Sequence, residues 1–304
     1  MENNITYDEY LELVKQEVSK RTGKRVQLQK VTKNNGLELD GLTIISEDTN
    51  VSPTIYLNGY YNEFITKGIE IVEKGIEAVA EKVIAIYKEN KPEIPFDISL
   101  ITDFSRVKPL IKMKLINYEE NKKLLADTPH IKVLDLAVVF MIVLETEDVC
   151  QFATILIHNK FLDYWETEID SLYKIAEENM RNDFETIPME NIIAAVMDES
   201  FVEECTTEME FKMFVLTTHN KLHGAIGMLN KELLNAFMKR HKTEKLIILP
   251  SSTHEVLLVP YSDEMVKMDL YEMVREVNET VLEETEYLSN SVYLYNGKEL
   301  KILE

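Results

Sequence analysis

The feature that most constrains the fold is the stretch 245–261, which reads K-L-I-I-L-P-S-S-T-H-E-V-L-L-V-P-Y. Two short runs rich in Ile, Leu and Val flank a polar insert that begins at Pro250. Such runs around a short polar turn are typical of a β-hairpin. The stretch therefore predicts a central antiparallel hairpin in a sheet of the C-terminal part.

The N-terminal part predicts a helix followed by a second hairpin. Residues 5–21 carry apolar side chains at helical spacing. Thr6 is a plausible N-cap, and Gly23 would end the helix. The run Asn34-Asn35-Gly36 is a strong turn signal between two strands within residues 25–45.

The remaining chain alternates between helical and extended patterns. We expect helices at 60–90, 117–126, 159–179, 187–201, 231–241 and 263–281, and strands at 97–103, 131–144, 152–157, 211–216, 246–249, 256–259 and 291–295. These elements predict an α+β fold, with antiparallel sheets built from hairpins and covered by helices. We divide the chain into an N-terminal α+β region, 1–128, and a C-terminal α+β region with central hairpins, 129–304; one continuous domain is the alternative.

The chain is strongly acidic, with a formal net charge of −21. Residues 163–210 hold fifteen acidic and two basic side chains. Binding to a phosphate backbone depends on Lys and Arg that displace counterions, so direct nucleic-acid binding is disfavoured. The acidic run is typical of a solvated helical face. The alternative, functional interpretation is a docking surface for a basic protein.

The chain lacks the sequence signatures of several classes of protein. The chain contains no GxGxxG, no GxxxxGK[ST], no HExxH and no GxSxG pattern, and we expect no cofactor. The longest apolar run is too short to span a bilayer, and the N-terminus lacks the pattern of a signal peptide. Two distant cysteines, Cys150 and Cys205, fit a reducing compartment. We therefore expect a cytoplasmic protein that does not enter membranes.

The polar insert of the central hairpin has the highest concentration of potentially catalytic side chains in the chain. Ser251 or Ser252, with His254 and Glu255, could supply a nucleophile, a base and an orienting acid. Neighbouring strand residues point to opposite faces, however, so His254 and Glu255 would not ordinarily face each other. The alternative interpretation is a structural turn, set by Pro250 and by serine hydroxyls bonded to the backbone.

Other polar residues are weaker candidates. His219 and His223 are four residues apart, which on a helix would place both imidazoles on one side as metal ligands, but the surrounding residues indicate a turn. Asp97, Asp103 and Asp135 lie beside apolar runs and are candidate paired carboxylates, although the sequence does not assign any pair.

Seven runs in one order carry a family resemblance. They are N-G-L-E-L-D-G-L-T-I (35–44), P-T-I-Y-L-N-G-Y-Y (53–61), L-I-N-Y-E-E-N (115–121), P-H-I-K-V-L-D-L-A-V-V-F (129–140), A-T-I-L-I-H-N (153–159), L-P-S-S-T-H-E-V (249–256) and L-S-N-S-V-Y (288–293). Together they resemble the bacterial domain-of-unknown-function 5688 family over nearly the whole chain. From Asp135 onward the chain has a strand pair, the Trp165 helix, a strand, Gly224-Ala225, a helix and then Pro-x-x-x-acid-Val-Leu. This order is also similar to the more distant domain-of-unknown-function 1444 family, in which the acid matching Glu255 persists and the residue matching His254 does not always. Neither resemblance implies an activity.

Three hypotheses for function follow. The first is a non-enzymatic cytoplasmic protein that binds a basic partner through an acidic surface, for example an accessory protein of a bacterial mobile element. The second is a hydrolase that uses Ser252 or Ser251 with His254 and Glu255. The third is an acidic mimic of nucleic acid, which needs carboxylates spaced like phosphates on one face. The sequence does not indicate the oligomeric state.

Overall fold

The computed structural model describes residues 5–47, 49–66, 72–91, 96–145, 152–196, 212–262 and 269–303. The chain divides into two compact units: unit 1 comprises Met1–Lys33 and Leu37–Ile98, and unit 2 comprises Asn34–Gly36 and Ser99–Glu304. The predicted seam between 128 and 129 therefore differs from the division between 98 and 99. The physical reason is that strand β4 (Ile111–Asn117) pairs along its whole length with β6 (Leu136–Glu145) of unit 2.

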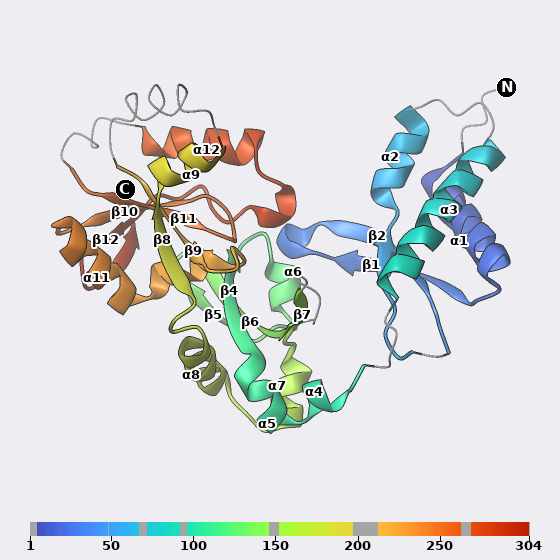
Figure 1. Ribbon diagram of the computed structural model, residues 1–304, viewed down its shortest axis with the longest axis horizontal. Helices are drawn as coiled ribbons and strands as arrows, with labels where there is room; N and C mark the ends of the chain where they lie inside the picture. The colour runs from blue at the N-terminus through green and yellow to red at the C-terminus, as the bar shows by residue number, and fades with distance from the viewer. Residues whose placement is uncertain are drawn as a thin grey trace. The chain divides into compact units, whose positions relative to one another are not determined.

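Unit 1 is a three-stranded antiparallel sheet with helices (Figure 1). The elements are α1 (Tyr7–Thr22), β1 (Val26–Thr32), β2 (Glu38–Ile44), β3 (Thr54–Tyr56), α2 (Asn58–Thr66) and α3 (Val72–Asn90). A capping box begins α1, because Thr6 accepts a hydrogen bond from the Glu9 amide and the Glu9 carboxylate accepts one from the Thr6 amide. Gly23, at φ 66°, ends the helix. The predicted N-cap, helix end and hairpin are confirmed.

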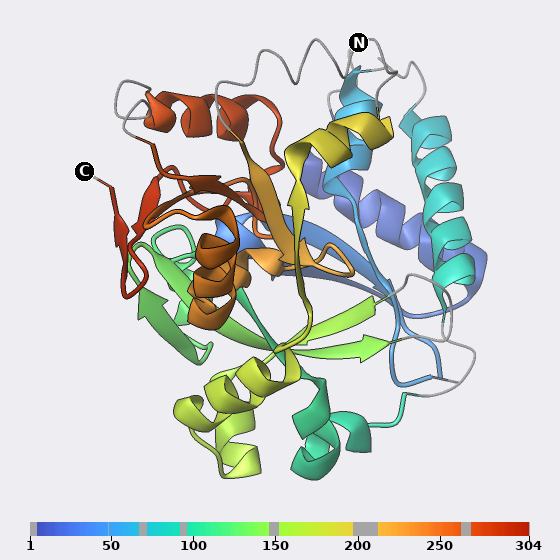
Figure 2. The same cartoon turned by 60° about the vertical axis from the view of Figure 1, so that its left-hand side comes forward.

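Unit 2 contains two antiparallel sheets (Figure 2). The six-stranded sheet has the order β13-β12-β10-β11-β9-β8; in the four-stranded sheet β4, β5 and β7 all pair with β6. The remaining strands are β5 (His130–Val133), β7 (Phe152–Leu156), β8 (Phe184–Pro188), β9 (Phe214–Thr218), β10 (Leu246–Pro250), β11 (Val256–Pro260), β12 (Tyr293–Tyr295) and β13 (Leu300–Ile302). The helices are α4 (Ser99–Thr102), α5 (Phe104–Val107), α6 (Lys122–Leu125), α7 (Asn159–Trp165), α8 (Ile169–Asn179), α9 (Met189–Val196), α11 (Lys231–His241) and α12 (Leu270–Thr280), with short 3-10 turns η1 (Asn34–Gly36), η2 (Lys108–Leu110), η3 (Gly224–Leu229) and η5 (Glu284–Glu286).

The predicted central hairpin is confirmed as β10 and β11, and β10 also pairs with β12 on its other side. Its side chains alternate between two cores. Leu246 and Ile248 join the main core together with helix α11, whereas Ile247 and Leu249 pack with α12 in a separate cluster. The uninterrupted apolar run in the sequence therefore reflects a strand that is covered by a helix on each face.

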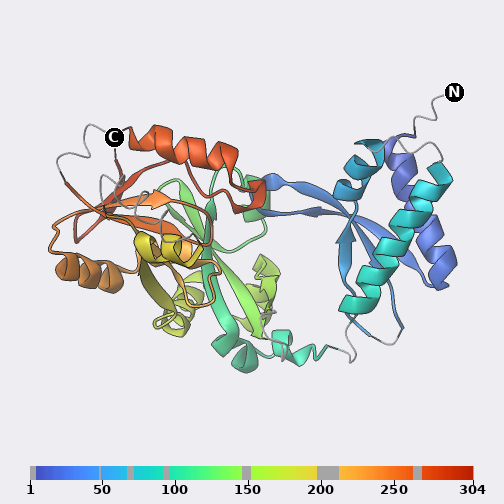
Figure 3. The same cartoon turned by 45° about the horizontal axis from the view of Figure 1, so that its top comes forward.

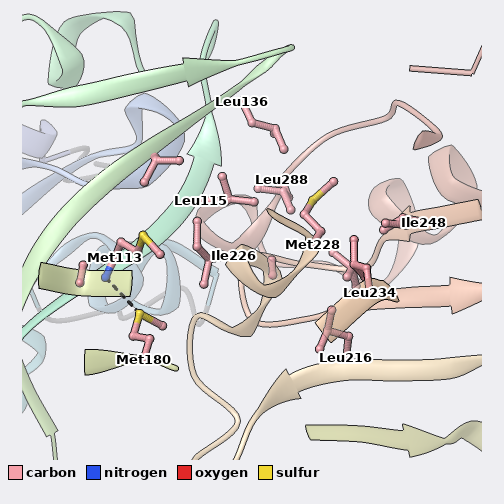
Figure 4. Packing of buried hydrophobic residues seen from close by; sticks show 14 of the residues in the cluster. Met113, Leu115, Leu136, Met180, Leu216, Ile226, Met228, Leu234, Ile248 and Leu288 are labelled. Atoms are coloured by element: carbon pink, nitrogen blue, oxygen red, sulfur yellow. Dashed lines mark hydrogen bonds between the residues drawn. The ribbon is translucent and has the colours of Figure 1, made fainter. Parts of the chain in front are cut away.

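The main core of unit 2 contains side chains from both sheets. Leu115 and Leu136 come from the four-stranded sheet, Leu216 and Ile248 from the six-stranded sheet, and Ile226 from η3 (Figure 4). The amide of Met113 donates a 3.3 Å hydrogen bond to the thioether of Met180 at this core.

Four predicted elements differ from the structure. The strand expected at 97–103 is instead helix α4, followed by Asp103, which caps α5 through its carboxylate. The strand expected at 131–144 is a β5–β6 hairpin, because Leu134 adopts φ 59°. The helix expected at 159–179 breaks at Glu166, at φ 51°. The helix expected at 187–201 begins as strand β8, which pairs with β9.

Two further expectations are partly met. Of the helix predicted at 117–126, only α6 is helical. Helix α12 covers part of the segment predicted at 263–281, whereas residues 263–268, Cys150, Cys205 and the acidic side chains at 198–210 lie outside the described residues. Within the described ranges, no helix combines the length and the apolar character that a bilayer crossing requires.

Candidate functional site

The hydroxyl groups of the β10–β11 turn bond to groups other than the imidazole. Ser251 Oγ donates a 3.1 Å hydrogen bond to Glu255 Oε1. Ser252 Oγ accepts a 3.0 Å bond from the backbone N–H of His254, in the manner of a Ser turn. Ser252 is also buried, with 6% of its surface exposed.

His254 connects this turn to the loop after β9. Its Nδ1 accepts a 3.1 Å hydrogen bond from the His223 amide, and the two rings stack at 5.1 Å. Because Nδ1 accepts, the proton of the neutral ring lies on Nε2, which is 3.6 Å from a Glu286 carboxylate oxygen. The His254 carbonyl accepts bonds from the Thr217 hydroxyl, at 2.9 Å, and from the Gly224 amide, at 2.8 Å.

These contacts bring Ser251 to Glu255, and His254 to His223 and Glu286. A Ser–His–acid relay needs a hydroxyl that donates to an imidazole nitrogen. Among the described residues, no hydrogen bond of this kind joins Ser251 or Ser252 to His254. The geometry thus favours the structural interpretation of the turn, and the hydrolase stays a prediction without an assembled nucleophile.

The two histidines considered as metal ligands have different surroundings. His219 is 65% exposed in its side chain and lies 3.8 Å from Glu185, which also pairs with Lys221. His223 packs against His254, and burial lowers its pKa to about 3, so its ring is neutral at pH 7. Within the described ranges, no group of three or more His, Cys, Asp or Glu side chains is arranged to hold a metal ion.

His223 also lines a small cavity in unit 2, and its Nδ1 has no protein hydrogen-bond partner. The cavity holds about 20 Å³, which is room for about one water molecule. Lys112 and Asp183, which also line it, form a 2.5 Å ion pair. This space is too small for an organic substrate.

A second polar cluster centres on Asp135, one of the three aspartates considered above. Its carboxylate accepts hydrogen bonds from the hydroxyls of Ser289 (2.6 Å), Ser291 (3.0 Å) and Tyr293 (2.8 Å). Asp103, in contrast, bonds to Ser105. Burial and the nearby Asp135 carboxylate raise the pKa of Tyr293 far above its ordinary value, so its hydroxyl remains a donor.

Asparagine side chains connect this cluster to neighbouring backbone segments. Asn117 Nδ2 donates to the Leu288 carbonyl at 2.9 Å. Asn121, which is 1% exposed, exchanges two 2.8 Å hydrogen bonds with Asn35 of the η1 turn in unit 2. The Asn35 Nδ2 then donates to the carbonyls of Glu284 and Tyr287.

An open pocket of about 280 Å³ lies beside these asparagines in unit 2. Helix α12 is followed along the chain by the turn η5, in the red part of the ribbon (Figure 3). The residues that line it are Asn35, Glu120, Asn278, Leu282, Glu284 and Tyr287. We call this space the acidic pocket, because the described residues of its wall include two carboxylates and no Lys, Arg or His.

The sequence pattern did not single out this pocket. It contained a signal nonetheless, because Asn35, Asn117, Asn121, Asp135 and the L-S-N-S-V-Y run all belong to the stretches that carry the family resemblance. Their meeting point depends on contacts between positions more than 150 residues apart, such as Ser289 with Asp135. Hydrophobic periodicity carries no information on such pairs.

The fold and this site define an α+β protein with two compact units, the second of which has an amide-walled acidic pocket. The model of a family of unknown function, DUF5688, matches residues 7–297, and the chain belongs to this family. The match confirms the resemblance predicted from the sequence and brings no activity with it. Comparison with curated proteins and with solved structures gave no match.

Proposed function

We propose that the protein is a binding protein whose acidic pocket receives a cationic side chain, Lys or Arg, of a basic partner. The observation that carries this proposal is the pair of carboxylates, Glu120 and Glu284, in one pocket wall. Within the described part of the chain, neither carboxylate forms an ion pair. Among these residues, no paired cation offsets the negative charge of the site.

The hydrogen-bonding groups of the pocket favour a donor-rich ligand. The Asn35 side-chain N–H groups are already bonded to the Glu284 and Tyr287 carbonyls. Those of Asn278 are bonded to the Ser289 carbonyl and to Asn290. The pocket thus presents carboxylate acceptors, whereas its amide donors are occupied, which suits an ammonium or guanidinium group.

The electrostatics and size agree with this ligand class. Burial and then the charge of Glu120 raise the pKa of Tyr287, so the phenol stays uncharged and adds no charge of either sign to the pocket. Pockets for whole drug-sized ligands enclose about 300–1,000 Å³. At about 280 Å³, the acidic pocket lies near the lower end of this range and has room for a Lys or Arg side chain of a larger partner.

A panel of defined peptides tests the proposal. We expect labelled twelve-residue peptides rich in Lys or Arg to bind the whole protein at low salt in fluorescence anisotropy, and acidic peptides of the same length not to bind. The double variant E120Q/E284Q should weaken binding about tenfold, which corresponds to about 1.4 kcal/mol. Binding should also weaken as salt increases.

A matched control separates the pocket from net charge. D163N/E177Q removes the same number of charges from exposed positions of helices α7 and α8. The control should bind the basic peptides within about twofold of the unmodified protein, since exposed charges outside the pocket contribute little to affinity. Equal losses in both double variants, or no binding of basic peptides at low salt, would overturn the proposal.

A further inference from the structure

Helix α12 and its C-cap residue carry an apolar stripe whose first half is buried and whose second half is exposed. Leu270, Val274 and Val277 lie on one side of α12, and Val281, the C-cap residue of the helix, continues their spacing of four, three and four. Leu270 and Val274 are 5% and 4% exposed in the cluster with β10. Val277 and Val281, at the other end, are 42% and 78% exposed.

The exposed end of the stripe adjoins the acidic pocket. Asn278 and Leu282, which line the pocket, follow Val277 and Val281 directly in the chain. Successive residues of a helix point in different directions, so the pocket and the valines lie at the same end of α12 on adjacent sides, where one peptide can contact both. We call Val277 and Val281 the exposed valine pair.

The surrounding charge determines what can cover this face. Residues 269–286 contain seven acidic side chains and one basic side chain, Arg275, which pairs with Glu272 and Glu279. A second copy of the chain would bring the same acidic surface against itself across a two-fold axis, and like charges would repel. A basic segment has the complementary charge.

We propose that the partner docks as a basic amphipathic helix. Its apolar side chains pack on the exposed valine pair, and one Lys or Arg enters the acidic pocket between Glu120 and Glu284. Helices that lay an apolar face on a hydrophobic surface, with flanking charges that set orientation, are a common mode of peptide recognition. This inference rests on the proposed function and adds the conformation and apolar face of the ligand.

Two synthetic peptides of equal charge test the docking mode. The first is an eighteen-residue Lys/Leu peptide with Leu at i, i+3, i+4 and i+7 spacing, and the second has Ser at every Leu position. We expect the whole protein to bind the Leu peptide about tenfold more tightly, from burial of apolar surface. V277S/V281S should lose this preference and still bind the Ser peptide, whereas E120Q/E284Q should weaken binding of both.

The control variant is V51S/I65S, which makes the same kind of change at two other exposed apolar positions, 42% and 52% exposed. It should keep the preference for the Leu peptide.

An unchanged preference in V277S/V281S would overturn the docking mode and leave the pocket proposal intact, provided E120Q/E284Q weakens binding. Failure of both peptides to bind would overturn both. A dimer in sedimentation that V277S/V281S abolishes would assign the valine pair to a second copy and also overturn the inference.

Discussion

Gly224 lies where the loop after β9 meets the carbonyl of His254. A Cβ atom at this position would lie 2.5 Å from Thr217 Cα, 2.6 Å from the Thr218 nitrogen and 2.7 Å from the His254 oxygen. All three are backbone atoms, which cannot rotate away as a side chain can. The Gly224 amide also donates to the His254 carbonyl. This residue therefore fixes the junction that holds the β10–β11 turn.

We expect Gly224→Ala to lower the free energy of unfolding by at least about 2 kcal/mol, because the backbone must shift to make room. The matched control is Gly59→Ala in helix α2, where an added Cβ meets nothing within 4 Å. That change should be neutral or slightly stabilising. Urea unfolding followed by far-UV circular dichroism compares the two; equal midpoints would contradict the close approach at Gly224.

At the scale of single residues, the sequence pattern predicted which side chains meet in the β10–β11 turn, but it did not predict their hydrogen-bond partners. Ser251, Ser252, His254 and Glu255 do lie together in a turn, as the pattern predicted. Their partners could not be predicted, since His223, Thr217 and Glu286 reach the turn through the tertiary fold. Alternation along a strand gives the face of a side chain, and gives no indication of which distant loop covers that face.

At the scale of elements, the Asp135 cluster links the β5–β6 hairpin to strand β12 and the segment before it. Three hydroxyls converge on one carboxylate, and Tyr293 is nearly completely buried. Burial first, and then the charge of Asp135, raise the pKa of Tyr293 above its ordinary value of 10.0. The neutral phenol is thus favoured in the folded protein.

This shift predicts a loss of stability in alkali. Below about pH 10 both the folded and the unfolded chain keep the phenolic proton, and the contribution is fully present. Above that pH the unfolded chain releases its proton first, so the free energy of unfolding falls as pH rises. We expect Tyr293→Phe to be less stable at pH 8 by about 1–2 kcal/mol, from the lost hydrogen bond, and to show a shallower decline between pH 10 and 11.

The measurement is urea unfolding followed by the fluorescence of Trp165, which lies in unit 2 with Tyr293. Tyr164→Phe is the control, because the Tyr164 side chain is 64% exposed. Its alkaline decline should match that of the unmodified protein. A Tyr293→Phe protein with an unchanged slope would show that this phenol does not govern the pH dependence.

The predictability of elements depended on how local their signals were. Helix α11 was predicted to the residue, because Asn230 caps it and its apolar spacing is helical throughout. Strands β10 and β11 followed from their apolar runs. The breaks at Leu134 and Glu166 were missed, because non-glycine residues with positive φ have no strong sequence signal.

At the scale of the whole molecule, each hydrophobic core lies within one of the two units. One cluster draws all its residues from unit 1, including Tyr10, Leu42 and Val83. The three other clusters draw theirs from residues 99–304. Since burial of apolar surface is the dominant favourable term in folding, each unit has its own source of stability.

We therefore expect the fragment 99–304 to fold without the N-terminal unit. Trp165, the single tryptophan, reports on this fragment because it is 7% exposed and stacks on Phe104 and Phe161. The fragment should show the emission of a buried tryptophan and one cooperative urea transition, as expected of a domain with a complete core. Residues 1–98, expressed alone, serve as the reciprocal test through the near-UV circular dichroism of their clustered tyrosines. Emission typical of exposed tryptophan, with a gradual urea response, would mean that the cores of 99–304 do not suffice, and the two units would then have to be treated as one folding domain.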